Sequence, residues 1–174
     1  VSLSTCFPVY LFPCLPANVR LLFLAPALPY PPRQGTAIRN WGLLRELARR
    51  HEITLLTFGT AGASVQNRGL PRDLLRDLIL IPPPRRSTAT RLRQQLSPLP
   101  DLAHRLRSPA WEAALRQLLG ERRREDTRFD NVQVEGLELA WNLPLVRALQ
   151  PQARLIYDAH NVEYQLQRTA FAAD

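Results

Sequence analysis

Short apolar runs alternate along the chain with segments in which apolar residues recur every three or four positions. The runs that we predict to be β-strands cover residues 21–25, 52–58, 78–81, 129–135 and 154–158. The first run contains no polar residue, which is typical of a strand buried on both faces of a parallel sheet. Strands that alternate with helices in this way predict an α/β protein with a doubly wound, mainly parallel, Rossmann-like sheet.

The most regular helical pattern follows the first strand. It covers residues 36–50, with Thr36 as the expected N-cap and arginines near its end. Its recurring apolar positions are Ile38, Trp41, Leu44, Leu47 and Ala48. Together with the strands on either side, this helix predicts a β–loop–α–β unit with a right-handed crossover.

A second long helix is expected over residues 108–124. Ser108 is a suitable N-cap, and Pro109 occupies the first helical position, where its missing N–H costs nothing. Shorter helices are expected at 70–78, at 90–96, at 137–149 with a restart at Pro144, and after residue 158. We find no internal repeat.

The length of 174 residues fits one domain, which we assign to residues 20–174. Residues 1–19 contain three prolines and no basic residue, so they do not resemble a signal peptide, and we expect a poorly ordered N-terminal extension. Cys6 and Cys14 provide neither a metal-ligand set nor a disulfide framework. Because no later apolar run approaches the roughly 20 residues that span a bilayer, we expect a cytoplasmic protein.

The chain carries 23 basic and 15 acidic residues, a net charge of +8, and every basic residue is arginine. Nucleic-acid binding is not favoured, because the arginines are scattered and few aromatic residues lie among them. The most basic region is expected between residues 85 and 126, where Arg85, Arg86, Arg91, Arg93, Arg105 and Arg107 lie. This region is either a set of solvated helix faces and loops, or a surface for anionic lipid or a phosphorylated acceptor at the inner face of a membrane.

Ligands of doubly wound sheets bind beyond the carboxyl ends of the strands, where the strand order reverses. With the usual order 3-2-1-4-5, the loop after the first strand and Glu135 at the end of the fourth face one crevice. Gly35 lies in that loop next to the helix start. It either allows a phosphate to approach backbone N–H groups or is a plain turn glycine. The chain has no glycine-rich dinucleotide or P-loop fingerprint, which argues against a dehydrogenase or an NTPase.

Polar residues also follow the fifth strand: Asp158, His160, Asn161 and Glu163. Such side chains can hydrogen-bond a polyhydroxylated ligand, and His160 titrates near neutral pH. The alternative is that Asp158 and Asn161 only cap the next helix. A metal site is not favoured, because this loop lacks a second group of ligands.

Three blocks, at residues 21–58, 129–146 and 154–163, resemble in their order the N-terminal, acceptor-side domain of a retaining GT-B glycosyltransferase of family 4 (group 1 type). The resemblance covers the chain from about Arg20 onward. It implies one half of a GT-B fold, in a two-domain enzyme that moves a sugar from a nucleotide-sugar donor to a glycan, lipid or small-molecule acceptor. It implies no cofactor and no bound metal; the nucleotide sugar is a co-substrate.

The resemblance also implies roles for individual residues. His160 corresponds to a catalytic histidine near the transferred sugar, with a positioning and electrostatic role. Gly35 corresponds to a glycine near the donor phosphates, although Gln34 precedes it here where many relatives have glycine or an acidic residue. The other implied substrate-binding residues are Arg39, Glu135, Asp158, Asn161 and Glu163.

The donor-binding domain, with its paired-glutamate motif, is not found before Asp174. We therefore expect a partner domain in cis or in trans, and an isolated chain that is inactive without it. The alternative of another class is a non-catalytic binding or recruiting module with the same fold, such as a subunit of a split enzyme. An unrelated doubly wound domain, such as a fragment of a nucleotide-sugar epimerase, is less favoured because the phosphate fingerprint is missing.

Overall fold

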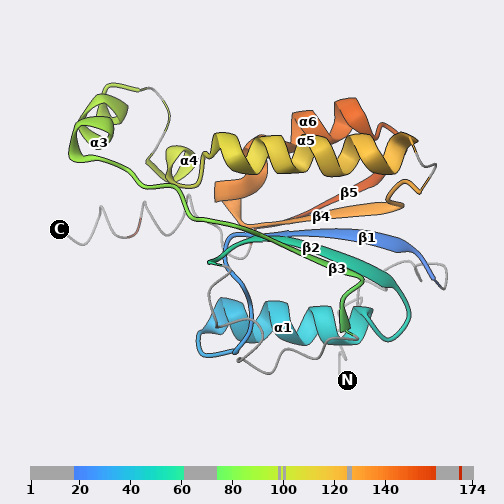
Figure 1. Ribbon diagram of the computed structural model, residues 1–174. Coiled ribbons are helices and arrows are strands. Elements are labelled where there is room, and N and C mark those ends of the chain that lie inside the picture. Colours follow the sequence, from blue (N-terminus) through green and yellow to red (C-terminus); the bar gives the residue numbers. More distant parts are fainter. Residues whose placement is uncertain are drawn as a thin grey trace, which may run out of the picture.

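The structure is a computed structural model that describes residues 18–60, 74–97, 99, 101–124, 127–159 and 169, with the backbone alone at residues 95, 123 and 124. Five parallel strands form one sheet in the order β3-β2-β1-β4-β5 (Figure 1). The strands are β1 (Arg20–Ala25), β2 (Glu52–Phe58), β3 (Asp77–Ile81), β4 (Asn131–Glu135) and β5 (Arg154–Asp158). The predicted α/β class, the parallel sheet and the predicted strand order are confirmed.

Helices cover both faces of this sheet. Helix α1 (Gly35–Leu47) lies on one face, and α5 (Pro109–Arg124) and α6 (Leu143–Leu149) lie on the other (Figure 1). A 3-10 helix, η2 (Leu137–Asn142), joins β4 to α6, where the sequence predicted one helix with a restart. Two short helices, α3 (Thr88–Gln95) and α4 (Asp101–Arg105), lie between β3 and α5, and α4 was not predicted.

The core has two layers that meet at the central strand. Because side chains alternate along a strand, Leu21 and Phe23 of β1 face α1, while Leu22 and Leu24 face α5. All four are at most 1% exposed. On the α1 side they pack with Leu44, and on the α5 side with a larger cluster that includes Trp111, Leu115, Leu119, Val132 and Val134. The first strand therefore fills both layers, as its unbroken apolar run predicts.

Helix α1 begins differently from the prediction. Its N-cap is Gln34, whose backbone is extended (φ −124°, ψ 157°) and whose side chain makes no capping hydrogen bond. Thr36 lies inside the first turn, so its assignment as the N-cap is wrong. The physical reason is that an N-cap needs non-helical backbone dihedral angles, and Gly35 and Thr36 are already helical. The first N–H groups of α1 therefore have no side-chain cap.

Helix α5 begins as predicted. The Oγ of Ser108 accepts a hydrogen bond from the backbone N–H of Trp111 at 3.3 Å, and Pro109 is the first helical residue. Arg122, one of its last described side chains, forms an ion pair of 2.6 Å with Asp77 at the start of β3. A capped start and a charged contact near its end fix α5 across the sheet.

The ends of the predicted segments differ in smaller ways. The helix predicted at 70–78 lies partly outside the described residues, and its last two residues, Asp77 and Leu78, belong to β3 instead. Of the predicted N-terminal extension, only Asn18 and Val19 are described; Val19 is buried, and the N–H of Asn18 donates to the carbonyl of Arg50 at 2.9 Å. Within the described part of the chain, no helix combines the length and the apolar character that crossing a bilayer would need.

Trp111 is expected to be the most costly single side chain to remove. It is fully buried on α5, and its ring stacks on Phe58 of β2 with 4.4 Å between centroids. We predict that Trp111→Ala lowers the free energy of unfolding by about 3–5 kcal/mol, because the contact and the filled volume are both lost. Urea unfolding followed by circular dichroism measures this, with Leu92→Ala, at a position 67% exposed, as the control. Equal effects of the two variants would contradict this view of the core.

Candidate functional site

The candidate site lies at the carboxyl ends of β1, β4 and β5. The chain leaves β1 toward α1 on one face of the sheet, and leaves β4 toward η2 on the other face (Figure 1). Gly136 makes the second turn with a φ of 78°, a value that favours glycine. Because β1 and β4 are neighbours, the strand order reverses between them, which is where doubly wound sheets bind ligands.

An ion pair joins α1 to β5 at this edge of the sheet. The guanidinium Nη2 of Arg39, on the second turn of α1, contacts Oδ2 of Asp158, the last residue of β5. The hydrogen bond that Arg39 donates to Asp158 raises the pKa of Arg39 above its ordinary value, against a smaller opposing effect of burial, and the charges of Asp158 and Glu135 also raise it. Both side chains remain accessible: that of Arg39 is 48% exposed and that of Asp158 is 20% exposed.

Glu135 is the buried member of the group. It is fully buried at the end of β4, paired in register with Asp158, and its Oε1 accepts a hydrogen bond of 2.6 Å from Nε2 of Gln133. A side chain with no exposed surface does not reach a ligand in this conformation. Glu135 therefore acts on the site through its charge, which favours the protonated form of the Arg39 guanidinium.

Gly35 is the first residue of α1, one helical turn before Arg39 and on the same side of the helix. A Cβ added there would meet no described atom within 4 Å. Packing therefore does not explain the glycine. The open space lies beside N–H groups that no side chain caps, so a ligand can approach them closely.

Three neighbouring features were not predicted from the sequence. Gln133, the partner of Glu135, lies two residues before it on the same face of β4, and the strand period of two could have indicated this pair. Asn40 is 2% exposed, and its Oδ1 has no hydrogen-bond partner among the described residues. Tyr30 in the loop after β1 packs on Trp41 of α1, with ring centroids 4.7 Å apart. This contact fixes the loop against the helix.

The remaining predicted residues have different outcomes. Arg39, Glu135, Asp158 and Gly35 are brought to one edge of the sheet. His160, Asn161 and Glu163 lie outside the described residues, as does the helix expected after β5. Within the described ranges, no three His, Cys, Asp or Glu side chains are grouped as a metal site would need.

The chemistry of this crevice is that of hydrogen bonding with charge assistance. Arg39 has five N–H donors, and the contact with Asp158 uses only some of them. Its half-exposed guanidinium can bind hydroxyl or phosphate oxygens. The carboxylate of Asp158 is of a type that accepts hydrogen bonds from hydroxyl groups. A ligand rich in hydroxyl groups, with or without a phosphate, matches this combination.

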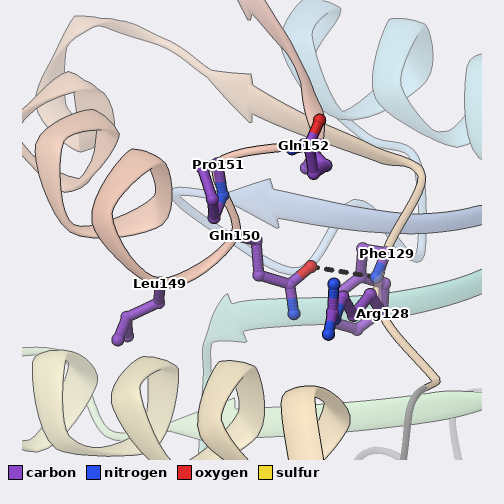
Figure 2. A pocket seen from close by; sticks show the side chains of 7 residues that line it. Arg128, Phe129, Leu149, Gln150, Pro151 and Gln152 are labelled. Carbon is purple, nitrogen blue, oxygen red and sulfur yellow. Dashed lines mark hydrogen bonds between the residues drawn. The ribbon is translucent and has the colours of Figure 1, made fainter.

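A cavity of about 80 Å³ lies at the opposite edge, where β4 and β5 begin (Figure 2). It is much smaller than the roughly 300 Å³ or more of typical ligand pockets. The buried Gln150 spans it, and its Oε1 accepts a hydrogen bond from the backbone N–H of Phe129 at 2.9 Å (Figure 2). Its Nε2 donates to the carbonyl of Leu119 at 3.4 Å. These bonds join α6, β4 and α5, so we assign a structural role to this cavity and keep the candidate site at the carboxyl ends.

Comparison of the chain with protein-family models and with curated protein sequences finds no match in either case. The structure shows an α/β domain with a doubly wound sheet and with polar side chains at its strand-order reversal. A function for these residues has to be argued from their own chemistry.

We predict that the Arg39–Asp158 pair is coupled only weakly in stability. A double-mutant cycle with Arg39→Ala, Asp158→Ala and the double variant is expected to give a coupling of about 0.5–1 kcal/mol, because both side chains are partly exposed and water screens the pair. Urea unfolding of the four proteins measures it. Full additivity of the two single variants would contradict the predicted coupling.

Gln150 is predicted to be a structural residue. Gln150→Ala leaves the N–H of Phe129 buried without a partner and is expected to lower the free energy of unfolding by about 1–3 kcal/mol. Gln152→Ala, an exposed position that lines the same cavity, is the control (Figure 2). Thermal unfolding with the same loss for both variants would argue against the bridging role of Gln150.

Proposed function

We propose that this chain is the acceptor-binding half of a retaining glycosyltransferase of the GT-B type. The observation that carries the proposal is the Arg39–Asp158 ion pair, which places an accessible donor and an accessible acceptor at the strand-order reversal. The resemblance of three sequence blocks to the N-terminal domain of family 4 enzymes supports it independently. In this proposal a nucleotide sugar is the co-substrate, and a separate donor domain in cis or in trans holds its nucleotide.

Each residue has a defined part in the proposed site. Asp158 accepts hydrogen bonds from hydroxyl groups of the acceptor, and Arg39 orients Asp158 and donates to oxygens of the acceptor or of the donor phosphate. Gly35 leaves the first N–H groups of α1 open to a phosphate. Glu135 keeps the guanidinium of Arg39 in place by its charge. His160, which the resemblance places near the transferred sugar, stays a prediction.

The proposal is tested by sugar binding to the chain itself. The probes are methyl glycosides of glucose, mannose and N-acetylglucosamine, measured by saturation-transfer difference NMR. We expect at least one of them to bind, and Asp158→Asn to weaken that binding by about tenfold, because a charge-assisted hydrogen bond and the orientation of Arg39 are both lost.

The matched control is Asp130→Asn. Asp130 is also paired with an arginine, Arg20, but lies at the amino ends of the strands, so its replacement should leave sugar binding unchanged. Binding of none of the sugars, or an equal loss for both variants, would contradict the proposed site. Sugar binding that persists without transfer, when a donor domain is supplied, would favour the non-catalytic binding module.

A further inference from the structure

Helix α3 presents its apolar residues to the outside. Leu92 is 67% exposed and Leu96, just after the helix, is 87% exposed; Leu99, further along, is 45% exposed. The helix projects from the body of the protein beyond the end of β3 (Figure 1). We call Leu92 and Leu96, which are four positions apart, the apolar stripe. Exposed large apolar groups that gather in this way are typical of an interaction surface.

Polar contacts, and not the leucines, hold α3 in place. Ser87 caps the helix, with its Oγ accepting from the N–H of Thr90 at 3.1 Å. Arg86 donates to Oε1 of Gln94 at 2.6 Å and forms an ion pair with Asp101 of α4. The hydrogen bond from Arg86 keeps the pKa of Asp101 below its ordinary value, so this pair persists at neutral pH. The apolar stripe is therefore not needed to order the helix.

Arginines flank the apolar stripe on both sides. With about 100° of rotation per helical residue, Arg91 and Arg93 lie about 100° to either side of Leu92, and Ala89 and Leu96 lie close to its direction. Helix α3 contains no acidic residue, and Arg85, which is exposed, precedes it. Within the described part of the chain, Arg85 and Arg93 make no ion pair. An apolar strip with a basic border on each side is the pattern of a helix that lies in the plane of a membrane interface.

We propose that α3 docks this protein on an anionic lipid surface, with the apolar stripe in the acyl region and Arg85, Arg91 and Arg93 on the headgroup phosphates. Charge decides between this occupant and a second copy of the chain. Two copies would bring their arginine borders together, which costs free energy, whereas an anionic bilayer neutralises them. The docking surface and the candidate site belong to the same end of the sheet, because α3 follows the carboxyl end of β3 (Figure 1).

The proposal does not depend on sugar transfer and is tested without it. The complete chain is sedimented with vesicles of phosphatidylcholine alone and with vesicles of phosphatidylcholine and phosphatidylglycerol in equal amounts. We expect binding to the anionic vesicles only, and weaker binding as sodium chloride is raised, because salt screens the arginines. Leu92→Ser/Leu96→Ser and Arg91→Ala/Arg93→Ala are each expected to lower the partition coefficient by about tenfold or more.

Matched controls come from α1 and the turn that follows it, on the other face of the sheet. Ile38→Ser removes an apolar side chain that is 56% exposed, and Arg45→Ala/Arg49→Ala removes the same charge as the arginine variant. Both should bind vesicles as the original chain does, and circular dichroism should show all variants folded. Absence of vesicle binding, binding of the leucine variant equal to that of the original, or a dimer in solution that the leucine variant breaks would each overturn the proposal.

Discussion

The central strand β1 must form hydrogen bonds along both edges and bury both of its faces, and the rest of the architecture follows from this. Its partners are β2 and β4, both parallel, so each strand has to be reached by a crossover on one face or the other. Right-handed crossovers then send the chain to α1 on one face after β1, and to η2 and α6 on the other after β4. The strand order reverses beside β1 because β1 is central, and the polar residues of the candidate site lie where β4 and β5 end and where α1 begins.

The same requirement explains which strands could be predicted well. The strands at 52–58 and 154–158 have the predicted bounds to the residue. Strand β1 needs side chains that fit two apolar layers, and this need produces an uninterrupted run that no helix or loop of similar length would carry. The hydrophobic pattern predicts short elements and the ends of elements less well. Helix α4 has five residues, DLAHR, which is too short for a helical period to be visible, so the sequence did not indicate it.

The candidate site was predictable only in part. Ends of strands can be located from the sequence, and with the strand order they place Glu135 and Asp158 at one edge. The contact between Arg39 and Asp158 joins residues 119 positions apart, and no local pattern specifies such a pairing. The burial of Glu135 was also not evident from the sequence. A charged residue at the end of a strand is usually exposed, but Glu135 is fully buried and is hydrogen-bonded to Gln133. Its charge acts on Arg39 from this buried position.

The structure also divides the arginine excess into groups that net charge could not separate. Arg20, Arg39 and Arg122 each neutralise a carboxylate at the start or end of a strand, so they belong to the fold or to the crevice. The arginines of α3 instead border leucines that face outward. Helix α5 begins at the Ser108 cap and buries Trp111, Leu115 and Leu119, whereas polar contacts hold α3 and its leucine stays exposed. Because polar contacts order α3, its apolar side stays exposed and can enter a lipid surface. The arginines beside it can then bind the lipid headgroups, as we propose.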